Sequence, residues 1–386
     1  MSITRYLTAV SLAAVVILAH VTLHKQFEWN GLISPDKIVG HSNRILPNTE
    51  IPIKLPETGM EGLDNYCAFI MSFFWVFLDP RNPRAFLEGK FLLSSLSSTW
   101  MIMLVEAHAG LSGSSAGFVF ATYLLEMGCE TIGVGLFTPI WCIVHLLITT
   151  APRSGAEVKR FSKHKNNVRA LGYALLVGHA LPTVLMMHLK PDGEGIASQQ
   201  LWTMLRALHP VWVFGVFKVF ETLFGGQSAV DQPAEQLHLS RRNLLQFSIL
   251  TSAVVHINCL TMMFGGHIFP TWVREEVLSE ISVSTMFVPA PFWTGEEVSF
   301  VKGVAMFVQW DYLCSAGAMV IWAASQYWEA TAIRKDRPSV RVAETLAQSV
   351  VMALVAGPGA AAAFLIQERD TVLATGVSEG RHVKEQ

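Results

Sequence analysis

Long apolar runs recur along this 386-residue chain and limit what it can fold into. Several of them hold 18 or more residues with few charges, which is the length that an α-helix needs to cross a bilayer. Only 15% of the residues are charged, whereas a soluble domain carries about 25%. The sequence therefore predicts an all-α protein, a polytopic transmembrane helical bundle of about eight or nine spans.

The whole chain is expected to form a single integral membrane domain, residues 1–386. Residues 1–24 hold a signal-anchor or first span; a cleaved signal peptide is the alternative, but no clean cleavage site follows the run. We expect a lumenal loop at 25–64, the helical bundle at 65–366 and a polar tail at 367–386. The individual spans are expected near 6–23, 65–79, 91–108, 118–150, 170–188, 207–224, 245–264, 303–327 and 343–366.

The segment 118–150 is too long for one simple span. Its glycines and Pro139 favour a single kinked or tilted helix, and a re-entrant piece is the alternative. Two spans here would reverse the orientation of everything before them. Arg81, Arg84 and Lys90 would then lie on the outer side.

Loop charge orients the bundle. The segment 151–169 carries six Lys and Arg residues, so the positive-inside rule places it in the cytoplasm. In that orientation Asp311, Glu106 and Glu126 fall in the outer half of the bilayer, on the same side as Asp64. The acids are expected to converge on one mouth, with the basic residues on the opposite side.

Asp311 is the most informative acid. It lies about seven residues inside the span that begins at Val304, roughly 10 Å deep at 1.5 Å per residue. A carboxyl there is costly and usually functional. Glu126 and Glu130 are one helical turn apart and share a face. The alternative for each acid is pairing with a His, Arg or backbone group that fixes helix packing.

No metal motif accompanies these acids. The chain has no DDxxD, no HExxH and no P-loop, and its five cysteines form no CxxC. We therefore expect no metal and no cofactor. The net charge of −2 gives no reason to expect a nucleic acid partner.

Buried carboxyls among aromatic residues suit proton-initiated carbocation chemistry. A carboxyl in a dry apolar site favours its neutral form and can act as a general acid toward an epoxide or alkene. Aromatic faces then stabilise the cation, by up to about 2 kcal/mol per desolvated contact. Asp311 fits the acid, with Glu130, Glu126 or Glu106 as its partner. The candidate substrate-binding aromatics are Trp310, Tyr312, Tyr123, Trp202 and Trp212.

Four motifs resemble the fungal membrane-integral terpene cyclases of meroterpenoid pathways, of the ascofuranone type. They are GLDNYCAFIMSFF (62–74), CETIGVGLFTPIW (129–141), the GHALPTVLM run (178–186) with LWTMLRALHPVWV (201–213), and FVQWDYLCSAGAMVIW (307–322). Together with length and hydropathy they cover most of the chain. Asp64, in the first motif, is a further candidate for substrate binding.

The resemblance implies a metal-independent cyclase that protonates the terminal epoxide of a farnesyl-type chain on an aromatic or polyketide head. It maps the acid role onto Asp311 and places Gln309 and Glu130 at pocket positions. Position 130 holds Glu where an amide is expected, so it is either a second acid or a hydrogen-bonding equivalent. The expected partners are a hydrophobic prenylated small molecule and the lipids of the endoplasmic reticulum membrane.

Two other function classes stay open. A proton-coupled transporter would use Asp311 with Glu126 or Glu130 as a relay. Such transporters often contain inverted repeats, and this sequence shows no internal repeat. A non-catalytic membrane scaffold would tolerate the loss of Asp311. Protein partners are not indicated by the sequence.

Overall fold

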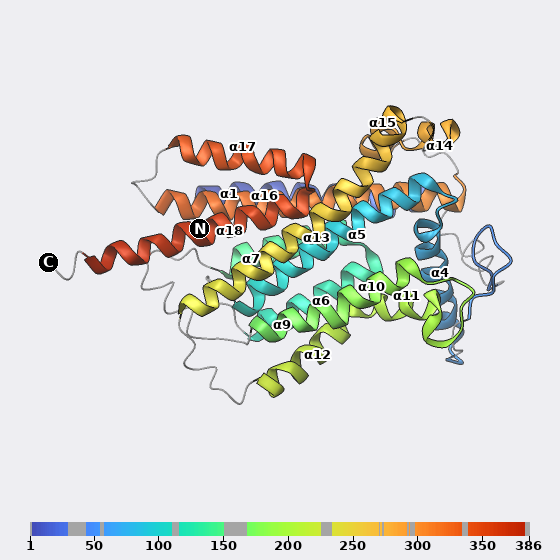
Figure 1. The fold of residues 1–386 in the computed structure, drawn as a ribbon, viewed down its shortest axis with the longest axis horizontal. Coiled ribbons are helices and arrows are strands. Elements are labelled where there is room, and N and C mark those ends of the chain that lie inside the picture. The colour runs from blue at the N-terminus through green and yellow to red at the C-terminus, as the bar shows by residue number, and fades with distance from the viewer. Residues whose placement is uncertain are drawn as a thin grey trace.

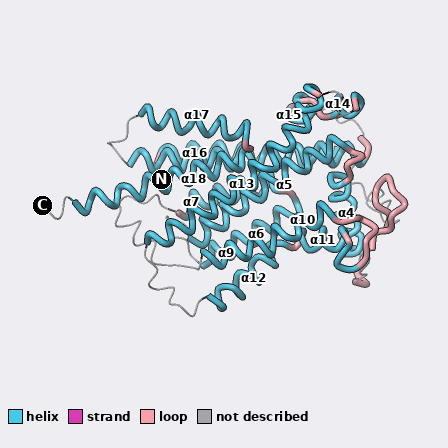
Figure 2. Tube along the Cα trace, in the orientation of Figure 1, coloured by secondary structure: helices cyan, strands magenta, loops and turns pink. Residues whose placement is uncertain are grey.

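The computed structural model confirms the all-α class. It describes residues 2–29, 44–54, 58–109, 116–149, 168–224, 234–269, 271, 274–291, 293, 298–333 and 339–382. Within these ranges the chain forms helices joined by turns and loops (Figure 2).

The helices are named in chain order. The first part holds α1 (Ile3–Ala19), a π-helical turn η1 (His20–Lys25), α2 (Gln26–Trp29), α4 (Glu61–Leu78), α5 (Pro83–Ala109), α6 (Ala116–Ile132) and α7 (Val134–Ile148). The middle holds α9 (Val168–Leu175), η3 (Leu176–Ala180), α10 (Leu181–His188), η4 (Gly195–Ala197), α11 (Gln199–Ala207) and α12 (His209–Phe224). The last part holds α13 (Ala234–Ile268), α14 (Glu275–Glu280), α15 (Val283–Phe287), α16 (Phe300–Ile333), α17 (Ser339–Val355) and α18 (Pro358–His382).

The long helices lie along one axis of an elongated bundle, and α4 stands across one end of it (Figure 1). We call this end, with α4, α11, α14 and α15, the α4 end. The chain termini lie toward the other end, the termini end. The central helix α16 packs against α1, α5, α7 and α18. Its Trp322 is fully buried with Trp100 and Trp141 in the largest core cluster.

The expectation of one kinked helix over 118–150 is wrong. The segment forms two antiparallel helices, α6 and α7, because Gly133 breaks it with φ of 136°, a conformation that favours glycine. Trp141 Nε1 donates to Thr122 Oγ1 at 3.0 Å, and the rings of Phe118 and His145 are 5.8 Å apart, which pairs the two helices along their length.

This hairpin also corrects the expected charge distribution. The start of α5 lies at the α4 end together with the start of α16, since Arg84 Nη2 donates to Gln309 Oε1 at 3.1 Å. The basic residues near position 84 are therefore not opposite Asp311. The expected span 65–79 differs as well, because α4 runs across the end of the bundle (Figure 1).

A second helix break lies in the expected span 343–366. Gly357 has φ of 93° and separates α17 from α18, which pack against each other. The segment expected as a polar tail is largely helical, since α18 continues to His382 and buries Arg369 and Asp370. Only 383–386 lie outside the residues described there.

The expected loop 25–64 is partly helical. The first helix continues through η1 and α2 to Trp29. Leu46 and Ile53 are buried with Trp75 of α4, so this part of the segment packs onto the α4 end. Residues 30–43 and 55–57 lie outside the described part.

Among the described helices, four are long and apolar enough to cross a membrane: Ile3–Trp29, Ala170–His188, Leu239–Ile268 and Phe300–Ala332. A fifth arises if α11 and α12, bent by 76°, count as one broken span. Exposed apolar side chains follow α1, α12, α13 and α17. These observations fit membrane association, and the count of eight or nine spans stays a prediction.

Candidate functional site

A cavity of about 630 Å³ lies at the α4 end. Ligand pockets commonly measure about 300–1,000 Å³, so it can hold a small organic molecule. Residues of η1, α2, α4, α5, α6, α7, α11 and α16 line it. Most are apolar: Leu23, Phe27, Phe69, Ile70, Phe73, Phe74, Phe77, Leu92, Leu93, Leu96, Ile132, Val134 and Phe307. The polar groups are His24, Asn65, Tyr66, Cys129, Glu130, Thr131, Arg206 and Asp311.

Asp311 extends from α16 toward the break between α6 and α7. The N–H of Gly135 donates to Asp311 Oδ1 at 2.6 Å, and the N–H of Val134 adds an interaction with the same carboxyl. These residues begin α7, where backbone N–H groups lack partners inside their own helix. A Cβ on Gly133 or Gly135 would lie 3.1 Å from Oδ1. The glycines thus allow the carboxyl to approach the helix end.

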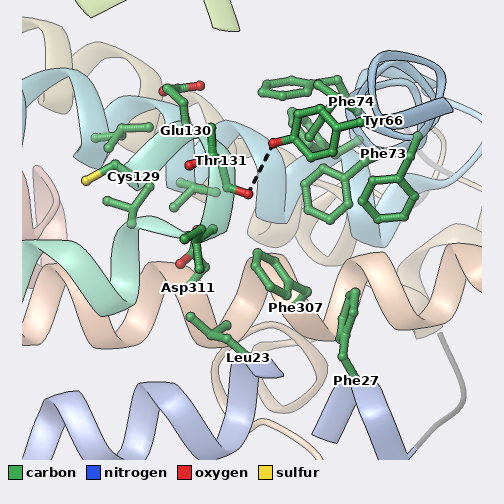
Figure 3. Close-up of a pocket in the computed structure, with 18 of the residues that line it drawn as sticks. Leu23, Phe27, Tyr66, Phe73, Phe74, Cys129, Glu130, Thr131, Phe307 and Asp311 are labelled. Atoms are coloured by element: carbon green, nitrogen blue, oxygen red, sulfur yellow. Dashed lines mark hydrogen bonds between the residues drawn. The ribbon is translucent and has the colours of Figure 1, made fainter. Parts of the chain in front are cut away.

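Glu130 occupies another point of the cavity wall (Figure 3). Arg206 Nη1 donates to Glu130 Oε2, and His209 Nδ1 lies 3.6 Å from Oε1. The three residues come from α6, α11 and the start of α12. The bend between α11 and α12 places Arg206 and His209 beside the same carboxylate. Each of these side chains is at most 3% exposed.

An aromatic wall faces these acids (Figure 3). Phe307 lies one helical turn before Asp311 on α16, so both share a face. Its ring contacts Phe73 edge-on at 5.3 Å and Phe27 at 4.9 Å. Tyr66 Oη donates to Thr131 O at 3.4 Å across the cavity. Because α4 crosses the bundle end, its phenylalanine face closes the cavity over Asp311.

Glu106 does not join this site, contrary to expectation. It accepts from Arg241 Nη2 at 2.8 Å and from Arg369 Nη2 at 2.7 Å. Asp370 completes the cluster, and Glu106 Oε2 lies 3.7 Å from His145 Nε2. Glu106 is near the C-terminal end of α5, while Asp311 is near the N-terminal end of α16. Both helices begin at the α4 end and run in the same direction, so the C-terminal part of α5 lies far from Asp311. The arginines hold Glu106 there, at the termini end.

Glu126 is fully buried but does not line the cavity. Neither of its carboxylate oxygens has a hydrogen-bond partner among the described residues. It lies one turn before Glu130 on α6, as the spacing predicted. Its role stays a proposal.

The residues beside Asp311 are used for packing. Gln309 Nε2 donates to Thr285 O at 2.9 Å and to Met286 O at 2.8 Å, which fixes α15 onto α16. Tyr312 is buried against Phe91, and Trp310 packs on the cluster around Cys314. None of the three lines the cavity, because neighbours in a helix point in different directions.

The other expected binding residues also lie outside the cavity lining. Asp64 accepts from Thr58 at the start of α4, and Tyr123 pairs with His108 at 3.0 Å. Trp202 Nε1 donates to Ile196 O, and Trp212 is 43% exposed.

Sequence reasoning assigned no role to Arg206 or to the phenylalanine wall. The sequence nevertheless contains a feature that points to each of them. Arg206 is the one cation inside the motif 201–213, and Phe69, Phe73 and Phe74 belong to the motif 62–74. A cation in an otherwise apolar run marks a buried functional group.

No group of three or more His, Cys, Asp or Glu residues in the described part of the chain is arranged to hold a metal ion.

Comparison with known proteins points to one family. The CtvD domain matches residues 6–374. Terpene cyclase ascI from Acremonium egyptiacum is 24% identical over 366 residues, covering 94% of this chain and 91% of the relative. Terpene cyclase ctvD from Aspergillus terreus is 20% identical over 335 residues, covering 85% and 89%. Terpene cyclase janA from Penicillium janthinellum is 24% identical over 284 residues, covering 73% and 72%. No solved structure matches the chain significantly.

Proposed function

Because this chain belongs to the CtvD domain family and is, like its curated relatives, a terpene cyclase, we propose that it cyclises a prenylated substrate by protonating an epoxide. The substrate is a farnesyl-type chain on an aromatic or polyketide head, as in meroterpenoid secondary metabolism. One observation carries the proposal. Asp311 is an acid on the wall of a mainly apolar cavity that is rich in phenylalanine, and a helix start faces its carboxyl.

The first step is proton transfer from neutral Asp311. The oxygen held by Gly135 accepts the amide hydrogen bond, and the other oxygen carries the proton to the epoxide oxygen. The epoxide C–O bond breaks toward the more substituted carbon and leaves a hydroxyl and a carbocation. The carboxylate that remains is stabilised by the N–H groups and dipole at the start of α7.

Ring closure follows without any change in composition. Each alkene π pair attacks the cation, which forms a carbon–carbon bond and moves the positive charge along the chain. Phe307 and Phe73 offer aromatic faces to this charge, and the apolar wall excludes water. A carboxylate accepts the last proton, so product and substrate are isomers.

Glu130 is better suited to the base than to a second acid. Its ion pair with Arg206 favours the carboxylate form. We propose that Glu130 accepts the final proton or orients the cation, and that Glu126 supports it from the next turn of α6. The proposal thus gives position 130 a charged partner, in place of a second acid or a hydrogen-bonding equivalent.

The protein is proposed to work inside the endoplasmic reticulum membrane as a multi-pass protein. Four described helices are long and apolar enough to cross it, and the hairpins at Gly133 and Gly357 add further antiparallel pairs. Total spans of eight or nine remain our proposal. A prenylated phenol partitions into the bilayer, so it reaches the cavity laterally.

The test uses yeast microsomes that carry the wild type, Asp311→Asn or the control Asp192→Asn, at an exposed position. Each receives an epoxyfarnesyl phenol with EDTA, and mass spectrometry reads the products. We expect an isomer of unchanged mass from the wild type and the control. Asn keeps the contact with Gly135 but cannot donate a carboxyl proton, so Asp311→Asn should lower the rate roughly 10²- to 10⁴-fold.

Two outcomes would change the proposal. Equal product from Asp311→Asn would remove Asp311 from the acid role and leave Glu126 or Glu130. Absence of product from folded wild type, together with proton-driven uptake into sealed vesicles, would favour the transporter instead.

A further inference from the structure

Arg206 has hydrogen-bonding capacity that the reaction above does not use. Its side chain is 1% exposed and lines the cavity. Nη1 donates to Glu130, but Nε and Nη2 are buried and have no hydrogen-bond partner among the described residues. Leaving donors unpaired in the interior is costly, and such groups need an explanation.

The ion pair with Glu130 does not fill this edge of the guanidinium. Nε and Nη2 point the same way and form a two-donor fork. In Arg241 the same fork holds Asp370 Oδ2, at 3.1 Å from Nε and 2.8 Å from Nη2. In Arg206 the free carboxylate oxygen, Glu130 Oε1, is instead 3.6 Å from His209 Nδ1. The Nε–Nη2 fork of Arg206 therefore has no hydrogen-bond acceptor among the described residues.

The surroundings hold the guanidinium in place. Its carbon lies 5.4 Å from the centre of the Phe74 ring and 5.1 Å from that of Trp100. These aromatic faces stabilise the charge but accept no strong hydrogen bond. The side chain is thus fixed before any ligand arrives, which lowers the entropy cost of binding.

We propose that the Nε–Nη2 fork of Arg206 binds a neutral oxygen, phenolic or carbonyl, on the head group of the substrate. This inference rests on the proposed function, because it assumes a prenylated head in the cavity. Arg206 and Glu130 together carry no net charge, so a neutral acceptor completes the site without adding an unpaired buried charge.

Head binding would fix the direction of the substrate. Arg206 lies on α11 and Asp311 on α16, and both line the same cavity. A head held by Arg206 leaves the far end of the prenyl chain to reach Asp311. The phenylalanine side chains of the same cavity would then fold the chain between these two polar points. Arg206 is in this sense a specificity residue for the head, separate from the acid.

The experiment measures binding without turnover. Purified full-length protein in detergent is titrated with a farnesyl phenol and with farnesylbenzene, neither of which carries an epoxide. Tryptophan fluorescence gives each Kd. Wild type should bind the phenol roughly 10- to 100-fold more tightly, as expected for hydrogen bonds to a charged donor. Arg206→Met should bind both probes equally, while the control Arg242→Met, at an exposed site, should keep the preference.

A second variant guards against misfolding. Arg206→Met leaves Glu130 unpaired, so the double variant Arg206→Met/Glu130→Gln removes both charges and should also bind the two probes equally. No phenol preference in wild type, or a full preference in either Arg206 variant, would overturn the proposal and leave Arg206 as a partner of Glu130 alone. A preference that depends on Arg206, with no cyclisation of the epoxide, would support this site and contradict the proposed reaction.

Discussion

The two ends of the bundle bury charge in different ways. At the termini end, Glu106 and Asp370 face Arg241 and Arg369, and hydrogen bonds of 2.6–3.1 Å connect the four side chains. At the α4 end, Asp311 accepts a backbone hydrogen bond, and two donors of Arg206 have no acceptor within the part of the chain that the structure describes. The charged groups at the termini end thus use their hydrogen-bonding capacity on one another, which we call a saturated arrangement. Those at the α4 end keep part of this capacity, which we call an open arrangement.

The difference separates structural from functional charge. A saturated cluster uses its charges on one another and ties α5, α13 and α18 together. Buried donors and acids that lack partners contribute less to stability, because no interaction inside the protein compensates for the free energy of their desolvation. Burial of a charge in a membrane protein therefore does not identify the site by itself. Polar groups on a cavity wall that still have hydrogen-bonding capacity are the better indication of a functional site.

The largest expected effect concerns the saturated cluster. Glu106→Gln leaves Arg241 and Arg369 with one carboxylate between them, and breaking a buried charge cluster in this way costs about 3–5 kcal/mol. We expect most of the protein to be lost or to melt at a much lower temperature in detergent. The folded fraction should keep its turnover per molecule. Thermal unfolding followed by size-exclusion chromatography measures this.

The control is Glu194→Gln, which removes an exposed partner of Lys54 and should leave the melting temperature unchanged. A Glu106→Gln protein that is fully stable but inactive would contradict this distinction between the two ends. It would indicate that Glu106 takes part in the reaction.

The next effect concerns the contact between the Asp311 carboxyl and the start of α7, which holds the acid in position. In Gly135→Ala the new Cβ would lie 3.0 Å from Asp311 O and 3.1 Å from Oδ1, so the carboxyl must move. These atoms must shift by a few tenths of an ångström, which is less than the displacement of about 1 Å that can cost a catalytic group roughly 100-fold. We therefore expect turnover to fall by roughly tenfold, and by less than about 100-fold, while the protein stays folded. The assay of epoxide cyclisation measures it.

The matched control is Gly317→Ala on the same helix as Asp311. A Cβ there meets nothing within 4 Å, so activity should be unchanged. Equal activity of the Gly135 and Gly317 variants would show that the contact with α7 does not position the acid.

The helical class and most helix positions could be predicted from the sequence, but the chain reversals could not. Gly133 and Gly357 lie in apolar segments in which a glycine is as compatible with a kink in one helix as with a reversal of the chain. Their positive φ values become visible only when the next helix packs back against the previous one. The direction of α4 depends likewise on its contacts with α5 and α11.

The site was predictable in part. Asp311 and Glu130 were placed at one pocket, and both line the cavity. Glu106 and Gln309 were not distinguishable from them, because their partners Arg369 and Thr285 come from distant segments. A sequence shows which polar groups are buried. It does not show which of them have already been satisfied.

The smallest expected effect tests the aromatic wall of the open end. Phe307→Leu keeps an apolar side chain one turn from Asp311 but removes a π face, which is worth up to about 2 kcal/mol for a nearby cation. Proton transfer should be nearly unchanged, and the cascade should stop earlier. We expect more partly cyclised or hydrated product and at most a roughly tenfold loss of the full product, read by mass spectrometry. Phe264→Leu, at an exposed position of α13, should leave the product ratio as in wild type. If both variants gave the wild-type ratio, Phe307 would serve only to shape the cavity, and the cation would be stabilised by the other aromatic residues and the acids.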